Sequence, residues 1–182
     1  HSFKIIPKKG EYYLLDKIEN KMVNHVLFMC PSKMGKGILV TPTAHGNVLM
    51  GPTALDLDFD SKLDVDTTIE GLNEVKFSVN GVIPQLTTRN VITSFAGLRA
   101  HRVGDDNDFI IAPSKENEHF INVAGIESPG LTAAPAIARY VGKMFREMDP
   151  SYEKKAEFIS KRPAPIRMAE LSPEERAEVV KK

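Results

Sequence analysis

One segment constrains the fold more than any other: residues 122–138, with the sequence NVAGIESPGLTAAPAIA. A short apolar run leads into a glycine-containing turn, and small residues typical of a helix follow. Glycines in such a turn let a large ligand approach backbone N–H groups, and a helix start favours an electron-rich group. The segment therefore predicts a strand–turn–helix wall that contacts a cofactor. The alternative is that the glycines serve only tight packing.

Length and charge bound the remaining possibilities. The chain has 182 residues, enough for one domain with a core plus a tail. Lys plus Arg and Asp plus Glu both number 24, so nothing suggests non-specific binding to nucleic acid. No apolar run approaches the roughly 20 residues of a membrane helix, and no secretory signal peptide pattern opens the chain.

The single cysteine bears on compartment and chemistry. Cys30 lies in the apolar run VLFMC, which favours a small buried side chain over a nucleophile. One cysteine allows no internal disulfide, so a reducing, cytoplasmic setting is expected.

Hydrophobic patterning predicts an α+β fold with a mixed, mainly antiparallel sheet and flanking helices, because the strands come in hairpins. The predicted strands are residues 11–15, 24–29, 37–43, 47–51, 90–102, 109–112 and 120–124. Turns are predicted at residues 7–10 (PKKG) and 44–47 (AHGN), and loops at 31–37 and 56–66.

Two helices and a tail complete the expected elements. One helix covers residues 68–80 with a threonine cap, and another covers residues 131–148 with Pro135 near its first turn, where proline is tolerated. From residue 149 onward, prolines and charges predict a linker, and Ser172 caps a short last helix. The chain therefore divides into residues 1–148 and 149–182.

Two side chains are candidates for chemistry. Arg99 ends an apolar strand and is suited to clamp a carboxylate or phosphate bidentately; the alternative is a surface ion pair. His45 at a predicted hairpin tip could shuttle a proton, or could simply be solvated. The other histidines show no metal-ligand spacing, so no metal site is expected.

Familiar nucleotide-binding loops are missing from the sequence. The stretch SKMGKG at residues 32–37 lacks the first glycine and the Ser or Thr of a phosphate-binding loop. No G-x-G-x-x-G occurs, so the usual dinucleotide fingerprint is absent as well.

Four motifs occur in one order along the chain: KGEYYLL at 9–15, GNVLMGPTA at 46–54, ITSFAGLR at 92–99 and GIESPGLTAAPAIA at 125–138. Together they resemble the C-terminal half of FAD-dependent oxidoreductases of the D-amino-acid-oxidase superfamily. The closest branch resembles bacterial glycerol-3-phosphate dehydrogenases and the related L-2-hydroxyglutarate oxidases. The resemblance covers residues 5–145 and is specific for the family and weak for the substrate.

The resemblance implies an organisation for the domain. Residues 1–148 would form a substrate-binding and flavin-capping domain, in which residues 108–148 return to the FAD domain. The N-terminal Rossmann half, which carries the missing fingerprint, would be a separate part, so the chain is interpreted as a fragment that binds FAD poorly and is inactive alone. A fragment of this kind exposes apolar surface and is expected to self-associate. Residues 161–182 resemble the linker that precedes an iron–sulfur module in longer relatives.

The resemblance also implies a site. Arg99 would grip the anionic group of the substrate. His45 is the only motif-embedded candidate for the base, which is otherwise unassigned. The residues implied to contact FAD are Gly97, Gly125, Ile126, Ser128, Pro129, Gly130, Leu131 and Thr132.

The implied reaction is oxidation of a small anionic secondary alcohol by hydride transfer to flavin. In the family that the chain resembles, L-2-hydroxyglutarate enzymes tend to carry a histidine in the strand that corresponds to residues 37–42, and this chain has none there. The resemblance therefore favours glycerol 3-phosphate, with L-2-hydroxyglutarate or another 2-hydroxy acid as the alternatives. A different class of function is a non-catalytic binding subunit whose partner chain supplies the nucleotide site. The expected location is cytoplasmic, with peripheral membrane association open for the full-length enzyme.

Overall fold

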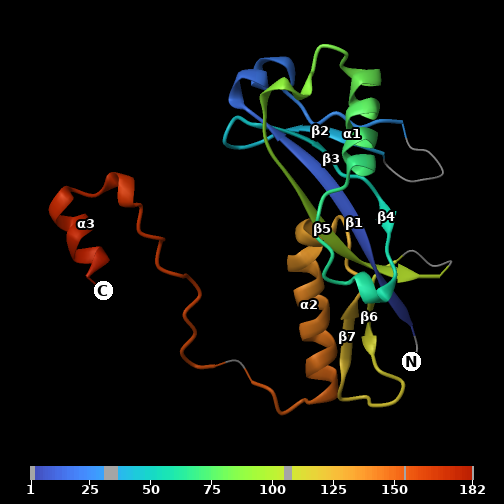
Figure 1. Ribbon diagram of the computed structural model, residues 1–182. Helices are drawn as coiled ribbons and strands as arrows, with labels where there is room; N and C mark the ends of the chain where they lie inside the picture. The colour runs from blue at the N-terminus through green and yellow to red at the C-terminus, as the bar shows by residue number, and fades with distance from the viewer. Residues whose placement is uncertain (1–2, 31–36, 105–107, 154, 182) are drawn as a thin grey trace. The chain divides into compact units, whose positions relative to one another are not determined.

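A computed structural model of the protein describes residues 3–30, 37–104, 108–153 and 155–181. These residues form two compact units, residues 1–148 and residues 149–182 (Figure 1).

The first unit is built around one long central strand, β1 (Lys4–Leu15). Along one edge, β5 (Val91–Val103) pairs with it over nearly its full length. Along the other edge, β3 (Val48–Gly51) pairs with the C-terminal end of β1, and β4 (Leu55–Asp56) pairs with its middle, at Lys8 and Lys9. Strand β2 (Leu39–Pro42) continues the sheet beyond β3. All described strand pairs are antiparallel, which confirms the mainly antiparallel character but not a mixed sheet.

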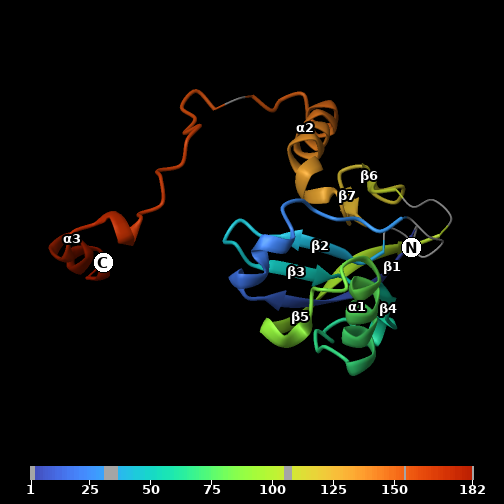
Figure 2. The same ribbon diagram turned by 90° about the horizontal axis from the view of Figure 1, so that it is seen from above.

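Helix α1 (Ile69–Val82) covers one face of this sheet (Figure 2). Val75 and Val79 of α1 are buried with Leu15, Val48 and Met50 of the strands, so the core lies between helix and sheet. Because side chains alternate along a strand, the other face of β1 and β5 carries residues such as Tyr12 and Arg99. No helix of this unit covers that face as α1 covers the core face, within the residues described.

A second layer of the unit consists of a hairpin and a long helix. Strands β6 (Ile110–Pro113) and β7 (Ile121–Ala124) pair with each other, and α2 (Gly130–Met148) follows. The predicted hairpin, the helix and the place of Pro135 inside its start are confirmed. The apolar residues of α2 recur at helical spacing and face the hairpin.

Three sequence predictions are wrong. Residues 7–10 form no turn but lie inside β1, because β5 pairs with them residue by residue and outweighs their turn-like composition. Residues 24–29 form no strand, since only Leu27 bridges to Val40 through one reciprocal pair of backbone hydrogen bonds. Cys30 is exposed and not buried.

Other local predictions are confirmed. Backbone bonding between Thr43 and Asn47 closes the β2–β3 hairpin, and Thr68 caps α1 by accepting a hydrogen bond from the Gly71 N–H at 3.1 Å. The loop at 56–66 holds only a short 3-10 helix, Phe59–Ser61, after β4. Most of the loop at 31–37, and the rejected phosphate loop, lie outside the described residues.

Within its described residues, the second unit contains one short helix, α3 (Pro173–Val180), preceded by a 3-10 turn at Met168–Glu170. Ser172 caps α3 in a reciprocal capping box with Glu175, as the sequence predicts. Across the parts of the chain that are described, no helix combines the length and apolarity that crossing a membrane requires.

Candidate functional site

The uncovered face of β5 places three residues in a row at every second position: Phe95, Gly97 and Arg99. Across the strand boundary on β1, Tyr12 lies opposite Phe95 and Gly10 lies opposite Gly97. The rings of Tyr12 and Phe95 are stacked, with centroids 5.0 Å apart and planes 10° from parallel. The face therefore runs from an aromatic pair, across two glycines, to an arginine.

Arg99 is held by a backbone carbonyl. Its Nη2 donates a hydrogen bond of 3.2 Å to the carbonyl of Thr53, in the connection between β3 and β4. Because Thr53 lies beside β1 on the edge away from β5, the Arg99 side chain crosses β1 to reach it. A Cβ at Gly10 would come within 2.8 Å of Pro52 Cβ and 3.3 Å of the same Thr53 oxygen.

A carboxylate of the turn before α2 meets the same arginine. Oε2 of Glu127 lies 3.8 Å from Nη1 of Arg99, and its Oε1 lies 2.5 Å from Nδ1 of His101. Glu127 and His101 are four-fifths buried, whereas the Arg99 side chain is 34% exposed. Glu127 thus joins the turn to two side chains on the open face of β5.

The turn itself is seated tightly on the sheet. Gly125 has φ of +64°, a left-handed conformation that favours glycine, and a Cβ there would lie 3.2 Å from Arg102 Cβ. The N–H of Gly130 donates to the Glu127 carbonyl at 2.6 Å, which closes the turn. The position of Glu127 against β5 therefore follows from the packing of its turn.

The far side of this turn is open. Ser128, Pro129 and Thr132 are exposed, and Leu131 is 93% exposed at the start of α2. The first N–H groups of a helix lack intrahelical acceptors and carry partial positive charge. The partial positive charge of this helix start, beside the exposed apolar side chain of Leu131, fits a flat, electron-rich ring such as a flavin.

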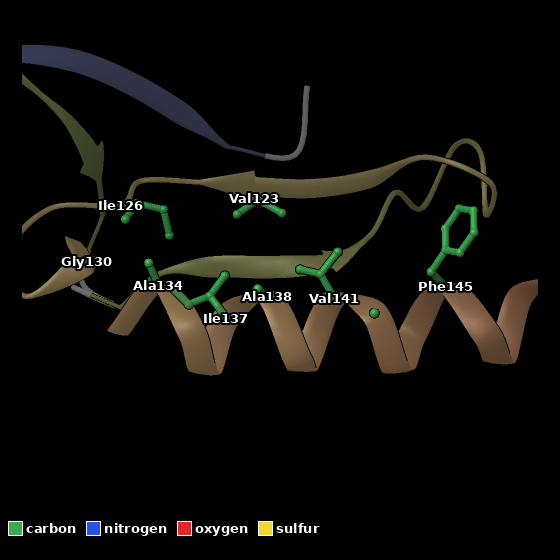
Figure 3. A pocket seen from close by; sticks show the side chains of 9 residues that line it. Val123, Ile126, Gly130, Ala134, Ile137, Ala138, Val141 and Phe145 are labelled. Atoms are coloured by element: carbon green, nitrogen blue, oxygen red, sulfur yellow. The ribbon is translucent and has the colours of Figure 1, made fainter. Parts of the chain in front are cut away.

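An apolar groove continues from this turn along α2. Ala134, Ile137, Val141 and Phe145 of α2 point toward the hairpin, where Val123 and Ile126 face them (Figure 3). Phe145 is 41% exposed and Val123 is 45% exposed, so the hairpin covers the groove only in part. Such a half-covered apolar stripe is typical of a surface that another element packs against.

The charges around Arg99 shape its surroundings. Lys8, opposite Arg99 on β1, forms a 3.2 Å ion pair with Asp56. Burial raises the pKa of the Tyr12 hydroxyl above its usual value of 10.0, and the positive charge of Arg99 offsets part of that rise. Tyr12 therefore stays a neutral hydroxyl at physiological pH, within the field of Arg99.

The structure brings most of the sequence-predicted residues together, with one exception. Arg99, Gly97 and the turn from Gly125 to Thr132 lie in one neighbourhood, linked through Glu127. His45 is exposed at the tip of the β2–β3 hairpin. That hairpin pairs with β1 at Leu15, seven residues and about 23 Å along the strand from the pairing of Arg99. The structure does not bring His45 to the arginine.

Sequence reasoning missed four side chains of this neighbourhood: Tyr12, Phe95, His101 and Glu127. Their signal was present, since Phe95 and His101 share the face of Arg99 by the two-residue period of a strand. Glu127 lies inside the segment of residues 122–138 that predicts the cofactor wall. Among the described residues, no group of three or more His, Cys, Asp or Glu side chains could hold a metal ion.

Comparisons with known proteins bear directly on this geometry. A family model described as "FAD dependent oxidoreductase" (DAO) matches residues 1–144. A glycerol 3-phosphate dehydrogenase of Caloramator mitchellensis is 48% identical over the whole chain, which covers 37% of that relative. A glycerol 3-phosphate oxidase of Mycoplasma genitalium is 37% identical over 76% of the chain and 35% of the relative.

A solved structure agrees with these relatives. The dithionite-reduced, FAD-bound L-α-glycerophosphate oxidase of Mycoplasma pneumoniae superposes with a TM-score of 0.68 at 34% identity. The match covers 79% of this chain and 37% of that protein. The chain therefore spans a little over a third of the length of the relatives it resembles.

Proposed function

Because the chain belongs to the family of FAD-dependent oxidoreductases, we propose that it forms part of a flavoenzyme that oxidises glycerol 3-phosphate. One observation carries the proposal: Arg99 lies on the open face of β5, tied through Glu127 to the turn that opens α2. An anion-binding side chain and a wall suited to a flavin are thus neighbours. The identity of 48% to a glycerol 3-phosphate dehydrogenase supports this substrate over 2-hydroxy acids.

Each part of the neighbourhood has a role in this proposal. FAD supplies the hydride acceptor. One N–H of Arg99 Nη2 donates to the Thr53 carbonyl, and the remaining N–H groups of the guanidinium bind the phosphate of the substrate in the bidentate manner that a guanidinium favours. The Thr53 carbonyl fixes the guanidinium, so less side-chain freedom is lost when the anion binds. The partial positive charge at the start of α2 would stabilise negative charge on a flavin ring held against this turn.

The groove along α2 supports a further part of the proposal. Its apolar, half-covered lining suits packing against the nucleotide-binding part of the same enzyme. We propose that residues 108–148 belong with that part, and that the isolated 182-residue chain self-associates through this surface. Sedimentation of the isolated chain over a wide range of concentrations tests this, and a monomer throughout contradicts it.

The main test uses the protein expressed from its complete gene and loaded with FAD. Oxidation of glycerol 3-phosphate is measured beside L-2-hydroxyglutarate for the wild type, Arg99→Met and Arg99→Lys. Losing charge-assisted hydrogen bonds is expected to raise KM for glycerol 3-phosphate at least about tenfold in Arg99→Met. Arg99→Lys keeps the positive charge but loses the paired N–H donors of the guanidinium, so its KM is expected to lie between those of the wild type and Arg99→Met.

Arg139→Met, on the exposed surface of α2, is the matched control and keeps the KM of the wild type. Faster turnover of L-2-hydroxyglutarate would replace the proposed substrate with its alternative. A flavin-loaded protein that oxidises neither compound would favour the non-catalytic binding subunit.

A further inference from the structure

Neither the backbone conformation nor the neighbouring atoms of Gly97 require a glycine at this position. Its φ lies outside the positive range that favours glycine. A Cβ built on it meets no atom within 4 Å. By contrast, a Cβ at Gly10, its partner across the strands, would come within 2.8 Å of Pro52. Neither backbone conformation nor packing within the described residues explains why position 97 carries no side chain.

The surroundings of Gly97 are bounded on three sides. Phe95 and its stacked partner Tyr12 stand on one side along the strands, and Arg99 stands on the other. Across β1, Pro52 and Thr53 fill the space above Gly10. The open position therefore lies between an aromatic pair, a prolyl wall and a guanidinium.

We propose that Gly97 is the floor of the substrate seat, on which the carbon chain of the anionic alcohol lies, in place of the FAD contact that the family resemblance implies for this residue. In this arrangement the anionic end binds Arg99, and the carbon chain contacts Phe95 and Tyr12. The inference rests on the proposed function and deepens it, because it names a residue that sets the size of substrate the site accepts.

The dimensions agree with a small substrate. Phe95 and Arg99 are four residues apart, which places their Cα atoms about 13 Å apart along the strand. After the side chains at both ends are allowed for, the space suits a chain of a few carbons with one anionic end. The hydroxyl of Tyr12, which lies in the field of Arg99, adds a polar group at the edge of the seat.

The test separates a seat from a structural glycine. Alanine at position 97 gives the strand a residue that it favours over glycine, and no atom of the chain obstructs it. The unfolding midpoint of Gly97→Ala is therefore expected to equal or exceed that of the wild type. Filling the seat with one methyl group is expected to raise KM for glycerol 3-phosphate about tenfold, with a smaller change in kcat.

The variants are compared in the FAD-loaded protein from its complete gene. Gly81→Ala, another glycine with no atom within 4 Å of its Cβ, serves as the matched control on α1 and keeps the wild-type KM. Inorganic phosphate supplies a readout that needs no turnover, through its perturbation of the flavin absorbance. Its affinity is expected to change less in Gly97→Ala than the KM does, because phosphate alone needs Arg99 and not the seat.

The outcomes separate this inference from the proposed function. A wild type that does not oxidise glycerol 3-phosphate refutes the proposed function, and the seat is then judged with the alcohol that is oxidised. An active wild type with an unchanged KM in Gly97→Ala refutes the seat alone. Loss of FAD in Gly97→Ala would show that Gly97 contacts the cofactor and not the substrate. Loss of stability with an unchanged KM would show that Gly97 is needed for packing. Either result overturns the inference.

Discussion

Replacing Glu11 by alanine is expected to destabilise the protein far more than any substitution of an exposed acid. Glu11 is 1% exposed, and its carboxylate accepts hydrogen bonds from the Thr68 N–H at 2.8 Å and the Thr68 hydroxyl at 2.9 Å. Its Oε1 also lies 4.0 Å from Nζ of Lys9, which is 2% exposed. The side chain thus anchors the start of α1 to β1 and faces a buried cation.

The magnitude follows from these contacts. Breaking a buried ion pair by removing one partner costs about 3–5 kcal/mol. Lys9 keeps the Asp64 carboxylate at 3.0 Å and the Asp66 carbonyl at 3.1 Å, so it is not left alone. The loss therefore falls toward the lower end, about 3 kcal/mol, which corresponds to a fall of about 6–12 °C in the unfolding midpoint. Glu11→Gln keeps an acceptor for Thr68 and is expected to cost about half as much.

Denaturant unfolding followed by circular dichroism measures both variants. Glu70→Gln is the matched control, because Glu70 is an exposed acid in the first turn of the same helix. Its expected cost is below about 0.5 kcal/mol. If Glu11→Ala and Glu70→Gln lose similar stability, the assignment of a buried anchoring role to Glu11 is refuted.

Three further outcomes are expected. Gly10→Ala forces a Cβ to within 2.8 Å of a neighbouring proline side chain and should cost about 1–3 kcal/mol of unfolding free energy, measured with denaturant; wild-type stability would contradict the crowding. The hydrogen bond from Lys9 is the main cause that lowers the pKa of Asp64 in the folded protein. The ionised Asp64 carboxylate therefore contributes its full stabilisation of the fold above the usual pKa of 3.8, and this contribution is lost as the pH falls through the lower folded-state pKa. The stability difference between the wild type and Asp64→Asn should therefore shrink below about pH 3.8 in acid unfolding, and a constant difference would disagree. Arg99→Met removes the positive charge that partly offsets the effect of burial on the Tyr12 hydroxyl, so the pKa of Tyr12 should rise further in an absorbance titration referenced to Tyr12→Phe. An unchanged titration would show that the Arg99 guanidinium does not act on the Tyr12 hydroxyl.

The elements that the sequence predicts correctly carry local signals. The β2–β3 hairpin has a glycine at its tip, Gly46, with φ of +87°, and the Thr68 cap fixes the start of α1. Both features act within a few residues, so a pattern in the sequence is sufficient to find them. The turn at Gly125 is also a local feature, because its φ of +64° favours glycine, the residue that the sequence has there.

The elements that it misses depend on partners far along the chain. Pro7 has the composition of a turn, yet it pairs with Ala100 inside a strand, since β5 supplies a partner for nearly every residue of β1. The contacts of the candidate site also join residues that are far apart in the sequence, because Glu127 contacts Arg99 and His101 only when its turn packs on β5. A histidine that looks isolated in the sequence thereby gains a carboxylate 26 residues away.

The two faces of β1 serve different purposes. Its residues Lys9 and Glu11 point into the buried network below α1, whereas Gly10 and Tyr12 face the open side with Arg99. One strand therefore builds both the fold and the candidate site, and its two faces divide the two tasks. Substitutions at positions 9 and 11 should lower stability first, whereas Tyr12→Phe should leave the unfolding midpoint nearly unchanged while it alters substrate binding. Equal losses of stability from Tyr12→Phe and Glu11→Ala would show that the Tyr12 hydroxyl belongs to the folding core and not to the candidate site.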